Sequence, residues 1–131
     1  ESDTIRKTNS YTYEARFLNI MTAMHEDLSK VFPWFIAKAS YFPSREIDVA
    51  TCSKTGQSYG RMTQMNEIRT AQNSLWQQKY VFSGPDTDVY FGSDYRYPGA
   101  RGGCVHFSKR GLIVHGTLWL NAVLEAGIIP K

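Results

Sequence analysis

The sequence has no apolar stretch that approaches the roughly 20 residues needed to cross a bilayer as a helix, so it predicts no membrane-spanning segment. It also has no run of like charge. The 15 basic and 12 acidic residues are scattered along the chain and leave a net charge of +3. Because a protein that follows a phosphate backbone presents clustered lysines and arginines, this distribution does not indicate a nucleic-acid partner.

The sequence also lacks the signatures of metal and cofactor sites. Its three histidines, His25, His106 and His115, lie far apart and have no cysteine or carboxylate at ligand spacing. The glycines do not form a phosphate-binding fingerprint, because they neither follow a predicted strand closely nor have the required spacing. We therefore expect no metal ion and no cofactor. Only two cysteines occur, Cys52 and Cys104, and they are too few for a disulfide framework, so one disulfide and two free thiols both stay open.

The apolar residues that are present predict an α/β protein with one hydrophobic core. They recur at helical spacing over residues 11–31 and 61–77, and again after Ser108, while short apolar runs at 34–41 and 79–82 predict strands. The stripe on the first helix consists of Tyr13, Phe17, Ile20, Met21, Met24, Leu28 and Val31. Long connections between alternating helices and strands favour parallel strands with right-handed crossovers, in a layered sheet flanked by helices.

In an open α/β sheet the ligand site lies at the carboxyl ends of the strands. This rule assigns the site to the residues after Tyr41 and after Phe82. The second of these loops, residues 83–103, is rich in glycine and proline, and its aspartates, arginines and aromatic residues supply groups that bind sugars by hydrogen bonds and stacking. The alternative, which the sequence supports equally, is a solvated loop that binds no ligand.

His106 is the candidate catalytic residue of this region. It comes just before Ser108, which can cap the last predicted helix, so its imidazole is expected at a corner between loop and helix. Such corners hold catalytic side chains in place and leave them accessible, and histidine is the commonest general base. A structural or incidental role is the alternative for a single histidine. We expect His25 to be solvated and His115 to pack on the last helix.

Two short blocks resemble the SGNH hydrolases, in their carbohydrate acetyl-esterase branch of sialate O-acetylesterase and acetylxylan esterase relatives. Glu1-Ser2-Asp3 resembles the second half of a Gln-Gly-Glu-Ser-Asp block, and Val105-His106-Phe107-Ser108 with Gly111 resembles the closing histidine block. The resemblance implies that residues 1–131 form the C-terminal half of the family domain. The serine nucleophile block has no counterpart before Glu1, and Gly56-Gln57-Ser58 is interpreted as a loop coincidence.

The resemblance implies that His106 is the catalytic base and that Glu1 and Asp3 flank the site. The family's aspartate, three positions before the histidine, is replaced here by Gly103. A carboxylate from elsewhere, with Asp94 and Asp88 as candidates, or a backbone carbonyl would then orient the imidazole. Relatives often read Arg-Tyr-Asp-Gly-Cys-His-Phe-Ser, so Arg96 and Tyr97 begin an expanded version of this block and are substrate-loop candidates.

The activity that the resemblance implies is hydrolysis of acetyl esters on carbohydrate by a serine and histidine mechanism. The partners are then an acetylated carbohydrate and a missing N-terminal half or second chain, and a secreted or periplasmic location is compatible with the family. One alternative is a non-catalytic carbohydrate-binding or interaction module that keeps the fold without the aspartate. Another is an independent single domain, residues 1–131, that shares the two short blocks by chance.

Overall fold

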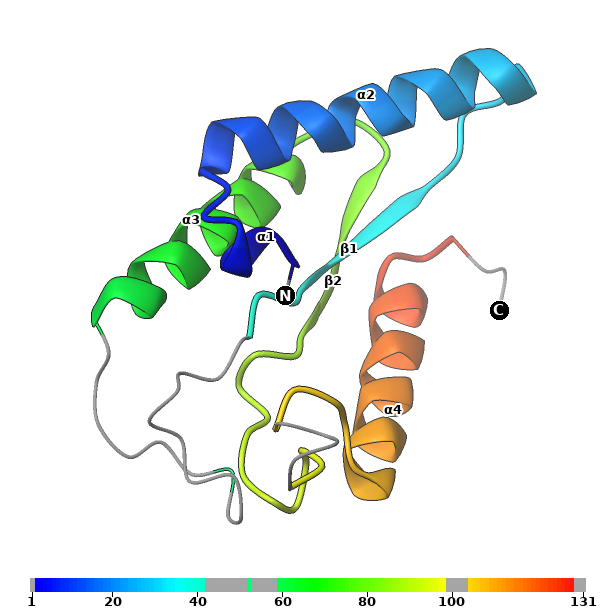
Figure 1. The fold of residues 1–131 in the computed structure, drawn as a ribbon. Helices are drawn as coiled ribbons and strands as arrows, with labels where there is room; N and C mark the ends of the chain where they lie inside the picture. The colour runs from blue at the N-terminus through cyan, green and yellow to red at the C-terminus, as the bar shows by residue number, and fades with distance from the viewer. Residues whose placement is uncertain (1, 42–51, 53–58, 99–103, 129–131) are drawn as a thin grey trace.

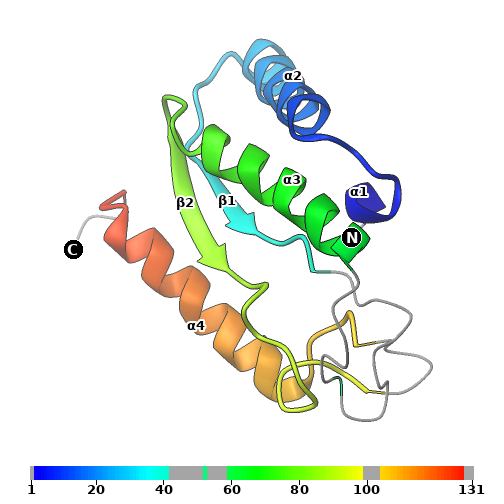
Figure 2. The same ribbon diagram turned by 90° about the vertical axis from the view of Figure 1, so that its left-hand side faces the viewer.

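The computed structural model describes residues 2–41, 52, 59–98 and 104–128. They form four helices and two strands: α1 (Ser2–Ile5), α2 (Ser10–Leu28), β1 (Trp34–Lys38), α3 (Tyr59–Leu75), β2 (Val81–Asp86) and α4 (Lys109–Glu125). The two strands pair in parallel, and the sheet lies between α3 on one side and α4 on the other (Figures 1 and 2). The predicted α/β character with parallel strands is therefore confirmed.

The helix ends follow local capping signals. Asn9 begins α2, because its side-chain oxygen accepts a hydrogen bond from the Thr12 amide at 2.8 Å, and the helix ends where Ser29 adopts a left-handed conformation with φ of 50°. The prediction of a helix over 11–31 is therefore three residues too long at its carboxyl end. Ser108 caps α4 as predicted, and its hydroxyl oxygen accepts from the Gly111 amide at 3.1 Å.

The strand ends differ more from the prediction. The first strand ends at Lys38 instead of residue 41, because the amides of Ser40 and Tyr41 donate to the Asp88 carboxylate. The second runs from Val81 to Asp86 instead of 79–82. The predicted loop 83–103 was therefore wrong over its first four residues, which belong to the second strand; of these, Ser83 pairs with Ile36 and Asp86 with Lys38.

Ile36, Leu75 and Val81 form the buried core. Partly buried side chains of α2, β1 and α3 pack against it: Tyr13, Phe17, Leu18, Met21, Trp34 and Trp76. The apolar stripe predicted on the first helix is only partly buried: Met21 packs on the core, but Ile20, Met24 and Leu28 in the second half of α2, and Val31 beyond its end, are exposed. This part of the helix extends beyond α3 (Figure 1), so the two-stranded sheet leaves it little to cover.

α4 packs on its face of the sheet through an irregularity in β2. The register between the strands shifts between Ile36 and Lys38, where Gly84 lies opposite Ala37. A Cβ atom on Gly84 would lie 2.8 Å from the Ala37 nitrogen and 2.9 Å from the Trp119 ring. Glycine thus lets Trp119 approach the strand backbone, where its ring also meets Phe35 edge-on with centroids 6.5 Å apart.

Candidate functional site

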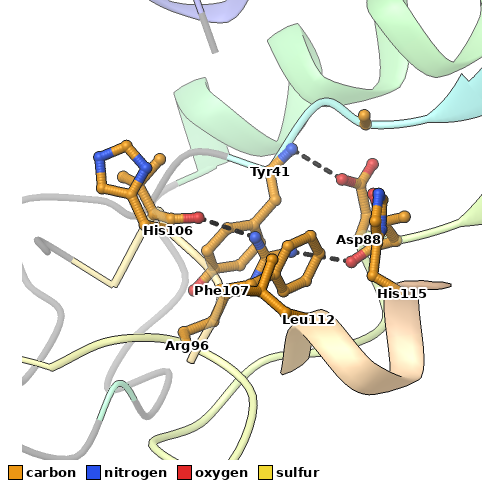
Figure 3. A pocket seen from close by; sticks show the side chains of 10 residues that line it. Tyr41, Asp88, Arg96, His106, Phe107, Leu112 and His115 are labelled. Atoms are coloured by element: carbon orange, nitrogen blue, oxygen red, sulfur yellow. Dashed lines mark hydrogen bonds between the residues drawn. The ribbon is translucent and has the colours of Figure 1, made fainter. Parts of the chain in front are cut away.

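A pocket of about 530 Å³ lies at the carboxyl end of the sheet. It is lined by residues that follow β1, residues that follow β2, the loop before α4, and α4 itself: Ala39, Tyr41, Thr87, Asp88, Arg96, Val105, His106, Phe107, Leu112 and His115. Figure 3 shows how these side chains surround it. The location agrees with the rule for parallel α/β sheets.

Arg96 connects the segments around the pocket. Its guanidinium and Nε donate to the backbone carbonyls of Tyr90, Val105 and Thr87 at 2.7 to 2.8 Å. The guanidinium also lies between two rings, with its central carbon 4.6 Å from the centroid of Tyr41 and 4.1 Å from that of Phe107. The residue is 4% exposed. Because its partners come from both sides of the expanded loop, Arg96 fixes the backbone next to His106.

The block that contains Arg96 and Tyr97 pairs directly with the block that contains His106 and Phe107. Arg96 and Phe107 form an antiparallel bridge, and the Tyr97 amide donates to the His106 carbonyl at 2.8 Å. The two blocks are therefore adjacent in the structure, although they are separated in the sequence. A disulfide joins Cys52 to Cys104, two residues before the histidine, which settles the question that the sequence left open.

The start of α4 is fixed against the same loop. The Ser108 amide donates to the Tyr95 carbonyl at 2.9 Å, and its hydroxyl donates to the Asp94 carbonyl at 2.5 Å. A Cβ atom on Gly111 would overlap the Tyr95 carbonyl oxygen and lie 2.9 Å from the Phe107 ring. Gly111, one of the residues that carry the family resemblance, is thus required for this close contact.

His106 is exposed, and Figure 3 shows its imidazole pointing away from Asp88 and Arg96. Its backbone is held through its carbonyl, which accepts a hydrogen bond from the Tyr97 amide. Among the described residues, no carboxylate is hydrogen-bonded to this imidazole. The structure therefore gives His106 a fixed backbone and an accessible ring, without an orienting acid in the described part of the chain.

Asp88 is held away from His106 by its own partners. Its carboxylate accepts from the amides of Ser40 and Tyr41 at 2.8 Å, and from the Ser40 hydroxyl and the Arg69 guanidinium, both also at 2.8 Å. Arg69 also binds Asp86 through two hydrogen bonds of 2.6 and 2.8 Å and so holds the pKa of that carboxyl below its usual range. Asp88 thus fixes the chain that leaves β1, which includes the Tyr41 ring under Arg96.

The candidates Asp94, Asp3 and Tyr97 are described by the structure and do not line the pocket. Asp94 is exposed and forms an ion pair with Arg110 at 3.4 Å. Asp3 accepts from the Thr8 hydroxyl at 2.9 Å, and Tyr97 is 58% exposed. Glu1, Gly103 and the Gly56-Gln57-Ser58 segment lie outside the described residues. The structure therefore brings His106, Asp88 and Arg96 to one pocket, and it does not bring Asp3, Asp94 or Tyr97 into it.

The lining residues that sequence reasoning did not place in the site include Tyr41, Phe107 and His115. His115 packs on α4 as expected, with its ring centroid 4.9 Å from that of Phe107, and its Nε2 accepts from the Trp119 indole at 2.9 Å. Burial, and secondarily the charge of Arg96, lowers the pKa of His115 below its usual value. Only the position of Tyr41 at the end of a predicted strand could have pointed to its role.

Within the described residues, no three histidine, cysteine, aspartate or glutamate side chains gather as metal ligands. None of the described helices is long and apolar enough to cross a membrane. Comparisons of the chain with models of protein families, with curated proteins and with solved structures found no match. The site must therefore be interpreted from its own geometry.

Proposed function

We propose that this chain provides the histidine part of an ester hydrolase site that removes acetyl groups from carbohydrate. The observation that supports this most is the position of His106, an exposed imidazole on a fixed backbone at the rim of a pocket at the carboxyl end of parallel strands. A general base needs this combination, because its ring must reach the substrate while its position stays fixed. The resemblance of Val105-His106-Phe107-Ser108 and Gly111 to the SGNH hydrolases supplies the reaction class, and a layered sheet of that family is the fold that we propose around β1 and β2.

His106 would act twice in each catalytic cycle. Its imidazole takes the proton of a serine hydroxyl as the serine oxygen attacks the acetyl carbonyl, and then gives this proton to the sugar oxygen as the ester bond breaks. In the second half, His106 takes a proton from the water that attacks the acetyl-serine, and gives it to the serine oxygen as the acyl bond breaks and acetate leaves. We assign the serine to polypeptide outside these 131 residues, in a preceding half or a second chain. The Cys52–Cys104 disulfide favours an oxidising compartment for the whole assembly.

The mechanism also needs a hydrogen-bond acceptor that orients the His106 imidazole, and three groups are candidates. Asp88 is the weaker candidate, since its oxygens already bind Ser40, Tyr41 and Arg69. Asp94 is the stronger one, because its ion pair with Arg110 is exposed on both sides and costs little to break. A backbone carbonyl is the remaining option.

The test is an assay of the complete polypeptide, including the serine block, on an O-acetylated oligosaccharide. His106→Ala should lower kcat/KM by about a thousandfold or more, because the serine loses its base. His25→Ala, an exposed histidine on α2, is the matched control and should leave it unchanged. Asp94→Asn should lower kcat more than it raises KM if Asp94 orients the ring. Undiminished activity of His106→Ala would contradict the proposal.

A non-catalytic module that binds carbohydrate is the second candidate. It is favoured by one observation: none of the described carboxylates reaches the His106 imidazole, whereas a carboxylate orienter contributes several powers of ten in rate in triad enzymes. In that case the complete polypeptide would bind the acetylated oligosaccharide without releasing acetate. Measuring binding and acetate release on the same sample separates the two functions.

A further inference from the structure

The side of α4 that faces away from the sheet is apolar and exposed. Figure 2 shows α4 at the outside of the fold, and its inner face carries Trp119, whose ring lies 2.9 Å from a Cβ atom placed on Gly84. On the opposite face, exposed residues recur at the helical positions i, i+3, i+4, i+7 and i+11, and we call this set the outer stripe: Ile113, Gly116, Thr117, Leu120 and Leu124. The side chains of Ile113, Leu120 and Leu124 are 64%, 57% and 56% exposed. A stripe with this spacing is typical of a helix that packs against a second helix.

The middle of the outer stripe is suited to a close contact between helices. A Cβ atom on Gly116 would meet nothing within 4 Å in the described part of the chain, so the fold of these residues does not require glycine there. Glycine lowers helix stability, but it allows a second helix to approach closely, because the separation of packed helices depends on the side chains at the contact. The Thr117 hydroxyl donates to the Ile113 carbonyl at 3.1 Å, so it brings no unsatisfied donor into such a contact.

The charges at the two ends of α4 are placed against the helix dipole. Lys109 and Arg110 occupy the first turn, Glu125 is the last residue, and all three are exposed. The dipole favours the reverse order, with acidic residues first and basic residues last. A second α4 that runs antiparallel would bring Glu125 of each copy to the basic end of the other, whereas a parallel one would bring like charges together. The ion pair of Arg110 with Asp94 is exposed on both sides and is little obstacle to this pairing.

We propose that α4 is the interface of a symmetric dimer, in which the α4 of a second copy of this chain lies antiparallel on the outer stripe and crosses it near Gly116. A two-fold axis at this point is self-consistent, because Ile113 of each copy then meets Leu120 of the other and the charged ends pair. The outer stripe contains none of the residues that line the pocket, so this inference goes beyond the proposed function and does not depend on it. One helix from each copy buries a small area, so we expect the dimer to be weak and concentration-dependent.

Sedimentation equilibrium of the 131-residue chain, from about 10 µM to about 1 mM, is the first test, and it should show a reversible monomer–dimer equilibrium. Gly116→Gln should raise the dissociation constant about tenfold or more, because a long side chain at the crossing keeps the two helices apart. The same variant should raise the melting temperature of the monomer, since glutamine is a better helix former than glycine, so a damaged fold would not explain the weaker dimer. Asn19→Gln, at an exposed position of α2, is the control and should leave the dissociation constant unchanged.

Charge reversal tests the antiparallel orientation. Glu125→Lys places like charges at both ends of the dimer and should raise the dissociation constant about fivefold or more at low salt, as should the double variant Lys109→Glu with Arg110→Glu. Both variants place charges that the helix dipole favours, so α4 itself is not weakened. An equimolar mixture of the two variants should regain the affinity of the unaltered protein, because every end contact in the mixed dimer then joins opposite charges.

A chain that stays monomeric at about 1 mM would overturn the proposal. An unchanged dissociation constant for Gly116→Gln would place the contact elsewhere, and an unchanged one for Glu125→Lys would exclude the antiparallel orientation. These readouts require no hydrolysis, so they hold whatever the activity of His106→Ala in the complete polypeptide. If the complete polypeptide remains monomeric where the 131-residue chain dimerises, another part of that polypeptide covers the outer stripe, and the proposal is also overturned.

Discussion

The two ends of the β1–β2 sheet are held by different forces. At the carboxyl end, Arg69 and Arg96 bind carboxylates and backbone carbonyls of several separate segments, and a disulfide joins Cys52 to Cys104 just before His106. At the opposite end the contacts are apolar, such as the edge-on contact of Phe17 with Trp34 at 5.6 Å, and Ile20 is exposed. A two-stranded sheet buries too little apolar surface to fix both ends, so the pocket depends on a few polar residues that are each costly to lose.

The largest expected effect comes from removing the polar centre of the carboxyl end. Arg96→Met leaves the carbonyls of Thr87, Tyr90 and Val105 without their donor, and it should lower the free energy of unfolding by about 3–5 kcal/mol. Urea unfolding followed by tryptophan fluorescence measures this loss. The matched control is Arg110→Met, whose exposed ion pair should contribute about 0.5 kcal/mol or less. Similar urea midpoints for the two variants would show that Arg96 does not hold this end together.

Two glycines of α4 sharpen the comparison within one helix. Gly111→Ala places a methyl group against the Tyr95 carbonyl and should destabilise the protein by about 2–3 kcal/mol, through a shift of the loop before His106. Gly116→Ala meets nothing within 4 Å and should stabilise it by up to about 1 kcal/mol. Thermal unfolding of both variants is the measurement. A stabilised Gly111→Ala variant would contradict the close contact between helix and loop.

A smaller effect, with a defined pH dependence, is expected at Arg69. Arg69→Met should cost about 2 kcal/mol at pH 7, because the partly exposed carboxylate of Asp86 and the buried carboxylate of Asp88 lose their charged donor. Arg69 holds the folded-state pKa of Asp86 below its unfolded value near 4, so this stabilisation is present above about pH 4 and is lost as the pH falls through the lowered folded pKa.

The measurement is urea unfolding at several pH values between 7 and 2. The difference between the unaltered protein and Arg69→Met should shrink as the solution becomes more acidic. Arg16→Met, which removes an exposed partner of Asp3 at 3.7 Å, serves as the control and should show little difference at any pH. A difference for Arg69→Met that stays constant down to pH 2 would exclude the ion pairs as its cause.

The smallest effect belongs to the opposite end of the sheet. Ile20→Ser should change the free energy of unfolding by about 0.5 kcal/mol or less, because this side chain on the second half of α2 is 53% exposed. Phe17→Ala, one turn earlier and packed on the core, should cost clearly more. If Ile20→Ser instead destabilised the isolated chain as much as Phe17→Ala, the two halves of the helix would be equally buried in solution.

Local signals in the sequence were sufficient for the type and order of the main elements. Apolar periodicity predicted α2, α3 and α4, and the hydroxyl of Ser108 marked the start of the last helix. The predicted ends were less accurate because they depend on distant partners. β1 stops where Asp88 binds the amides of Ser40 and Tyr41, 47 to 48 residues away in the sequence, and no local pattern records that contact.

The candidate site shows the same division. The sequence rule for parallel strands located the pocket, and the sequence alone selected His106, Asp88 and Arg96, all of which line it. It did not indicate that the Asp88 carboxylate accepts hydrogen bonds from the backbone amides after β1. It also gave no sign that Arg96 lies buried between Tyr41 and Phe107, since both rings come from other segments.

By itself, the sequence determined the α/β class, the cap of α4 and the residues available for chemistry, because periodicity and capping act between neighbours along the chain. Only the tertiary structure decided what each polar side chain does. In this structure the Asp88 carboxylate binds the backbone amides of Ser40 and Tyr41, and Cys52 and Cys104 form a disulfide. Nδ1 of His115 is buried without a hydrogen-bond partner among the described residues. The physical reason is that a buried polar group must find its partner in space, and in this fold most of those partners lie dozens of residues away in the sequence.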